Sequence, residues 1–174
     1  REVIGATVAR WFLTVGGDFF SGVDPWSIMG AFLDAPDHEA TAHRTLAILK
    51  AHGLRSHLVL VGSRAQAATD AQRSAIVQRA ANVIRGHEAE LHLVETHNEY
   101  LVNGSASHDC RNMARELRAL CPAGFPISLS SPNSVMGGNE PAAVVLAEYD
   151  KLYGGDSGAN RMSWSRFSTS NSFS

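Results

Sequence analysis

The chain has 174 residues, of which 44% are hydrophobic, and its 15 basic and 17 acidic residues give a formal net charge of −2. This composition is typical of a soluble globular protein with one core, either a single α/β domain over residues 1–174 or part of one. The near-neutral charge and the lack of a run of roughly 20 apolar residues argue against nucleic acid and membrane partners, and small uncharged or sugar-like partners fit better.

Predicted strands and helices alternate along the first half of the chain. Residues 10–16 (RWFLTVG) are a short apolar run that stops at paired glycines, which predicts a buried strand. Residues 37–52 have acidic side chains in the first turn and basic ones in the last, which predicts a helix. A continuous apolar run at 57–62 (HLVLVG) predicts the next strand, and 69–86 opens a helix with threonine and glutamine in capping-box spacing.

The same alternation continues in the second half. Residues 91–95 (LHLVE) predict a strand, and 107–121 predict a helix with an apolar stripe. Residues 125–131 (FPISLSS) predict a fourth strand, 140–153 a fourth helix, and 160–167 a weaker fifth strand. Such alternation implies right-handed βαβ units and a parallel sheet.

Two architectures are compatible with this pattern. A doubly wound sheet is complete with five strands, whereas a (β/α)₈ barrel needs at least about 200 residues, so length alone favours the open sheet. The strand order distinguishes them, because neighbours in the order 1-2-3-4-5 indicate a barrel segment and 2-1-3-4-5 a flavodoxin-like sheet. The Ser-rich tail at 168–174 is assigned to neither.

Common cofactor and nucleophile motifs are absent. Neither the glycine pair after the first predicted strand nor the glycine after the second continues as a dinucleotide or phosphate-binding loop, and no GxSxG elbow occurs. His87, Glu88 and His92 place the second histidine one residue too late for a zinc-binding HExxH helix. Cys110 and Cys121 lie on one predicted helix, about 16 Å apart along its axis, and are interpreted as buried thiols. We therefore expect no cofactor and no metal.

The segment 91–104 (LHLVETHNEYLVNG) differs, because an apolar strand runs directly into Asn98 and Glu99. An Asn and Glu pair at the end of the fourth barrel strand resembles that of clan A glycoside hydrolases, the cellulase-like superfamily. AHGLRSHLVLVG resembles the third strand unit of that family, and PISLSSPNS resembles the fifth. By this resemblance residues 8–165 span about the second to the sixth strand, which favours a partial TIM barrel over the five-stranded doubly wound sheet.

The resemblance implies a protein that acts on or binds a β-linked oligo- or polysaccharide. Glu99 would be the general acid/base that protonates the leaving oxygen, and Asn98 would hydrogen-bond the sugar 2-hydroxyl. His97 would tune the pKa of Glu99 or fill the strand end. Trp26 and Trp164 would offer flat faces for sugar rings or pack in the core.

One departure from the family pattern leaves alternatives open. The family's nucleophile is a Glu at the end of the seventh strand, and no Glu follows Glu148 here. Either the natural chain extends beyond Ser174, or the protein is a non-catalytic carbohydrate-binding or structural component. The start at Arg1 rather than Met likewise suggests that the natural N-terminus is processed or missing. A doubly wound domain that binds a small ligand or a protein is the third alternative. A partial barrel has two open sheet edges, which a homo-oligomer or larger assembly, the tail or further chain would cover.

Overall fold

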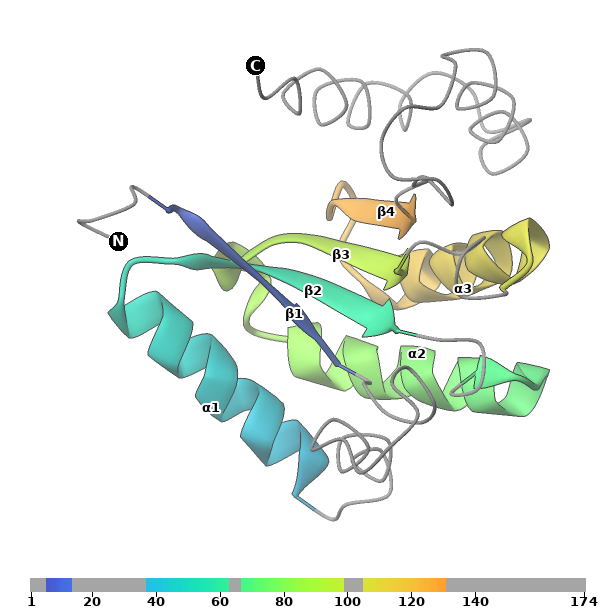
Figure 1. The fold of residues 1–174 in the computed structure, drawn as a ribbon, viewed down its shortest axis with the longest axis horizontal. Helices are drawn as coiled ribbons and strands as arrows, with labels where there is room; N and C mark the ends of the chain where they lie inside the picture. The colour runs from blue at the N-terminus through green and yellow to red at the C-terminus, as the bar shows by residue number, and fades with distance from the viewer. Residues whose placement is uncertain (1–5, 14–36, 63–66, 99–104, 131–174) are drawn as a thin grey trace, which may run out of the picture.

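The computed structural model describes residues 6–13, 37–62, 67–98 and 105–130. Strands and helices alternate through these ranges, as the sequence predicts (Figure 1). The elements are β1 (Val8–Phe12), α1 (His38–Ala51), β2 (Arg55–Val61), α2 (Asp70–Ile84), the 3₁₀ helix η3 (Glu88–Glu90), β3 (Leu91–His97), α3 (Ser107–Leu120) and β4 (Ile127–Ser130). The predicted helix at 140–153, the predicted strand at 160–167 and the tail lie outside the described residues.

The four strands form one parallel sheet in the order β1-β2-β3-β4. Each strand therefore lies beside its neighbour in the chain, and the predicted α/β class with parallel strand and helix repeats is confirmed. Right-handed crossovers between strands that advance in one direction place successive helices on the same face of a sheet. Figure 1 agrees with this rule, since α1 packs beside α2 and α2 beside α3.

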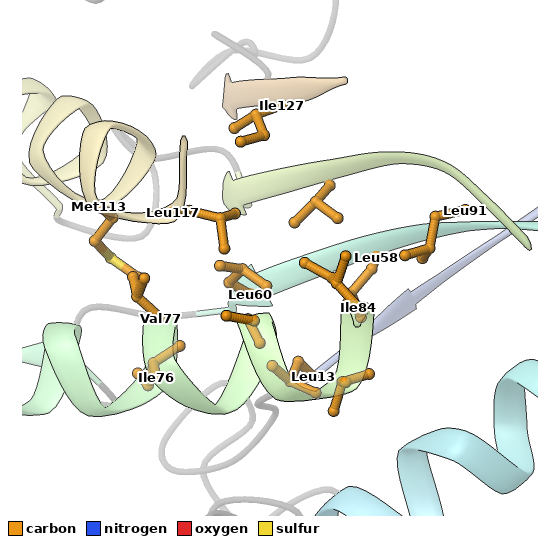
Figure 2. Packing of buried hydrophobic residues seen from close by; sticks show 14 of the residues in the cluster. Leu13, Leu58, Leu60, Ile76, Val77, Ile84, Leu91, Met113, Leu117 and Ile127 are labelled. Carbon is orange, nitrogen blue, oxygen red and sulfur yellow. The ribbon is translucent and has the colours of Figure 1, made fainter. Parts of the chain in front are cut away.

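The core fills the space between the sheet and the three helices. Leu58 of β2, Val94 of β3 and Ile127 of β4 are in register, so their side chains share the face that the helices cover. Figure 2 shows this face meeting α2 and α3. The buried cluster includes Leu58, Leu60, Ile76, Val77, Ile84, Val94, Met113, Leu117 and Ile127. Burying each such side chain contributes roughly 1.5–3 kcal/mol, so this layer fixes which face of each strand turns away from the helices.

The bounds of all four strands differ from the predicted ones, and β1 and β3 show why. β1 begins at Val8, before the predicted start at residue 10, because the sheet pairing with β2 already starts at Arg55. β3 continues through Thr96 and His97 to meet Val61 and β4, although both side chains are polar. A strand ends where its hydrogen bonds to neighbouring strands end. The polarity of the residues along the strand does not reveal that point.

The capping box predicted for α2 is confirmed. The backbone N–H of Gln72 donates to Oγ1 of Thr69 at 3.2 Å, and the backbone N–H of Thr69 donates to Oε1 of Gln72 at 2.9 Å. These bonds satisfy two donors that the first turn of a helix leaves without a partner. The helix start therefore depends on this threonine.

Replacing Thr69 with alanine is expected to lower the free energy of unfolding by about 1 kcal/mol, the usual cost of losing an N-cap. Urea denaturation followed by circular dichroism measures the loss. Thr45→Ala is the matched control, since the Thr45 hydroxyl donates to the carbonyl of Thr41 inside α1 and caps nothing. An equal loss in both variants would contradict the capping role.

The two cysteines are free thiols. Cys110 is fully buried in α3, as predicted, and Cys121 at the end of that helix is half-buried. Burial raises the pKa of both thiols above the ordinary value, and nearby Asp109 raises that of Cys110 further. Both therefore favour the unreactive protonated form at neutral pH.

Candidate functional site

A polar cluster lies on the face of the sheet that turns away from α1, α2 and α3. Leu58 and Leu60 point toward the helices, so His57 points to the opposite face because side chains alternate along a strand. Arg10 of β1 is in register with His57, and Glu95 of β3 lies two residues beyond the β3 partner of His57. Three neighbouring strands thus bring one charged or titratable side chain each to the same region.

Glu95 is the buried centre of this cluster, with a side chain only 4% exposed. Its Oε2 accepts a hydrogen bond from Nη2 of Arg10 at 2.9 Å and lies 2.8 Å from Nε2 of His57. A carboxylate oxygen only accepts hydrogen bonds. The hydrogen of the contact between Glu95 and His57 therefore lies on Nε2 of His57. Such charge-assisted bonds offset the cost of removing a carboxylate from water.

Arg10 connects the buried carboxylate to the residue that follows β3. Its Nη2 also donates to Oδ1 of Asn98 at 2.9 Å, and its guanidinium lies 5.1 Å from the centre of the Phe12 ring. The backbone N–H of Asn98 donates to the carbonyl of Val61 at 2.8 Å, so the main chain of Asn98 is still tied to β2. The backbone of Asn98 is therefore held by the adjacent strand β2, and its side chain by β1, one strand further along the sheet.

His97 fills the end of β3. It is 1% exposed, and its Nδ1 is buried with no hydrogen-bond partner among the described residues. Burial lowers the pKa of His97 to about 4, against an opposing effect of Asp109, while Arg73 lowers it further. The imidazole is therefore neutral at physiological pH, as a packed strand-end residue requires.

The structure places only two of the five predicted site residues. His97 ends β3 and Asn98 follows it, and Asn98 belongs to the Arg10 cluster. Glu99, Trp26 and Trp164 lie outside the described residues. Of the two roles suggested for His97, filling the strand end agrees with its burial, and an effect on the pKa of Glu99 stays a prediction.

Sequence reasoning missed Arg10, His57 and Glu95 as site residues. A usable signal was present, because each is a charged or titratable residue within a strand that otherwise reads as a continuous apolar run. Such residues are seldom buried unless they are paired, so His57 and Glu95 on the largely buried strands β2 and β3 indicate a polar partner nearby, whereas Arg10 on the more exposed β1 gives a weaker signal. The separation of 85 residues between Arg10 and Glu95 hides that pairing from local pattern reading.

These observations define an α/β protein whose parallel sheet carries an ionic cluster, centred on the buried Glu95, that leads to the end of β3. Comparison with known protein families, with curated proteins and with solved structures found no match. Across the described ranges no three His, Cys, Asp or Glu side chains are grouped to hold a metal ion. None of the helices in those ranges is long and apolar enough to cross a membrane.

Proposed function

We propose that this protein resembles clan A glycoside hydrolases and acts on or binds a β-linked oligo- or polysaccharide, with Glu99 as general acid/base. The observation that carries the proposal is the contact from Arg10 to Asn98. This contact ties the side chain of Asn98, the residue immediately before Glu99, to Arg10 and through it to the buried Glu95, at the end of a parallel strand. Polar side chains at the carboxyl ends of parallel strands are where α/β folds place their ligands.

The sheet topology supports a barrel segment for this scaffold. The observed order β1-β2-β3-β4 is the neighbour order of consecutive barrel strands, whereas a flavodoxin-like sheet places its first strand between the second and the third. Helices on one face correspond to the outer ring of a barrel, and the opposite face to its interior. In this arrangement the Arg10, His57 and Glu95 cluster lies inside the barrel.

The proposed chemistry assigns different tasks to the two glutamates. Glu99 would donate a proton to the leaving oxygen, and Asn98 would hydrogen-bond the sugar 2-hydroxyl as positive charge develops on the ring. Glu95 is unsuited to act as nucleophile, because it is buried and engaged by Arg10 and His57. Its task is structural, and the second carboxylate of a retaining mechanism is expected from another segment.

The proposal is tested by incubating the protein with nitrophenyl β-glycosides, cello-oligosaccharides and soluble β-glucans. We expect release of nitrophenolate or new reducing ends from at least one of them. Calorimetric titration with the same oligosaccharides identifies the alternative, a carbohydrate-binding component, as binding without turnover. Absence of both binding and turnover across the panel would overturn the proposal.

A further inference from the structure

We propose that Glu95, Arg10 and His57 form a positioning network that fixes the carboxamide of Asn98, with its oxygen on Arg10 and its NH₂ group turned toward the ligand. The identity of that ligand as a saccharide rests on the proposed function. The network itself rests on contacts among described residues.

The orientation of the amide follows from the chemistry of Arg10. A guanidinium only donates hydrogen bonds, so the Asn98 atom that lies 2.9 Å from Nη2 must be the carbonyl oxygen. The NH₂ group lies on the other side of the same planar amide and points away from Arg10. Asn98 would therefore meet a sugar hydroxyl as a donor to its oxygen lone pair.

One nitrogen of Arg10 joins the two acceptors. Nη2 donates to Oε2 of Glu95 and to Oδ1 of Asn98, both at 2.9 Å, and it has one hydrogen for each. Without this nitrogen, Oδ1 of Asn98 loses the donor that ties it to Glu95, which favours rotation of the Asn98 amide. Arg10 therefore sets the orientation of the Asn98 amide, although the two residues come from different strands.

Glu95 and His57 hold the guanidinium in place. The Arg10 side chain is 38% exposed, so it needs an anchor, and the buried carboxylate supplies one. His57 binds the same Oε2 at 2.8 Å and so limits rotation of that carboxylate. The order of the network is therefore His57 to Glu95 to Arg10 to Asn98.

The first experiment reads the Asn98 side chain directly by ¹⁵N–¹H NMR, with its NH₂ pair assigned from the signal lost in Asn98→Asp. We expect Arg10→Met to move this pair to the position of a free carboxamide, Glu95→Gln to move it part of the way, and Arg10→Lys to retain part of the wild-type shift. Arg44→Met is the matched control, because Arg44 is an exposed arginine paired with Asp37 on α1. An unchanged Asn98 pair in Arg10→Met would overturn the network.

The second experiment measures hydrolysis of two substrates, nitrophenyl β-glucoside and its 2-deoxy analogue. The quantity compared is the ratio of their kcat/KM values. Arg10→Met is expected to reduce this ratio about tenfold, the value of one hydrogen bond, mainly through kcat. In an Asn98→Ala background the same substitution should have little further effect, whereas additive losses would contradict the coupling.

The two experiments separate failure of the function from failure of the network. A protein that hydrolyses no glycoside contradicts the proposed function, and the NMR measurement still decides whether Arg10 orients Asn98. If Arg10→Met does not fold, as judged by circular dichroism, Arg10→Lys replaces it. Lysine replaces the planar guanidinium with a compact ammonium group, which must shift the NH₂ signals of Asn98. Unshifted signals would overturn the proposal.

Discussion

Glu99→Gln is expected to lower kcat/KM on a cello-oligosaccharide by about two to four orders of magnitude, the usual contribution of a positioned general acid. Glutamine has nearly the same shape as glutamate but has no acidic proton for the leaving oxygen. The loss should be smaller on a nitrophenyl glycoside, because nitrophenolate leaves without being protonated. Steady-state kinetics on the two substrates therefore measure proton donation separately from binding.

The matched control for this variant is Glu116→Gln on α3, where the carboxylate accepts a hydrogen bond from Ser74 of α2 and so belongs to a helix-to-helix contact. It should hydrolyse both substrates at the wild-type rate. The melting temperature of Glu99→Gln should match that of the wild type, which excludes loss of fold as the cause. Full activity of Glu99→Gln on the oligosaccharide would remove Glu99 from the mechanism and leave only a binding role for this strand end.

Local rules predict those parts of the fold that depend on neighbours in the chain. The capping box at Thr69 is set by residues three apart, and Gly53 directly after the C-cap of α1 adopts a φ of 67°, a left-handed conformation in which glycine commonly ends helices. The alternation of apolar runs and amphipathic segments likewise indicates a parallel sheet, which the structure confirms in the described residues.

The candidate site was only partly predictable, because its contacts depend on register. Glu95 meets His57 across 38 residues, and the pairing of β2 with β3 is irregular between Ser56 and His57. A shift of one residue would turn these side chains to opposite faces of the sheet. Asn98 was proposed as a site residue because the adjacent Asn98 and Glu99 resemble a known motif, which can be recognised without knowledge of register, whereas Arg10 belongs to no such local motif.

The burial of His97 predicts that stability falls as the solution becomes acidic. Its pKa is lowered from 6.5 to about 4 in the folded protein, so between these values the unfolded chain binds a proton that the folded chain excludes. Protonation of this residue therefore favours unfolding, and its contribution is fully present above pH 6.5 and is lost as the pH falls toward 4. The linked loss is about 2 kcal/mol by pH 5 and about 3 kcal/mol by pH 4.

Urea denaturation of the wild type and of His97→Gln between pH 7.5 and pH 4 measures this contribution. The variant should lose less free energy of unfolding over that range, by the amounts given above, whatever its stability at neutral pH. Some acid sensitivity remains in both proteins, because burial also lowers the pKa of His38. Val59→Ala is the control, since it weakens the same sheet without removing a titratable group and should keep the wild-type pH slope. Equal slopes in the wild type and His97→Gln would mean that the pKa of His97 is the same in the folded and unfolded protein, which requires a partner for its buried Nδ1.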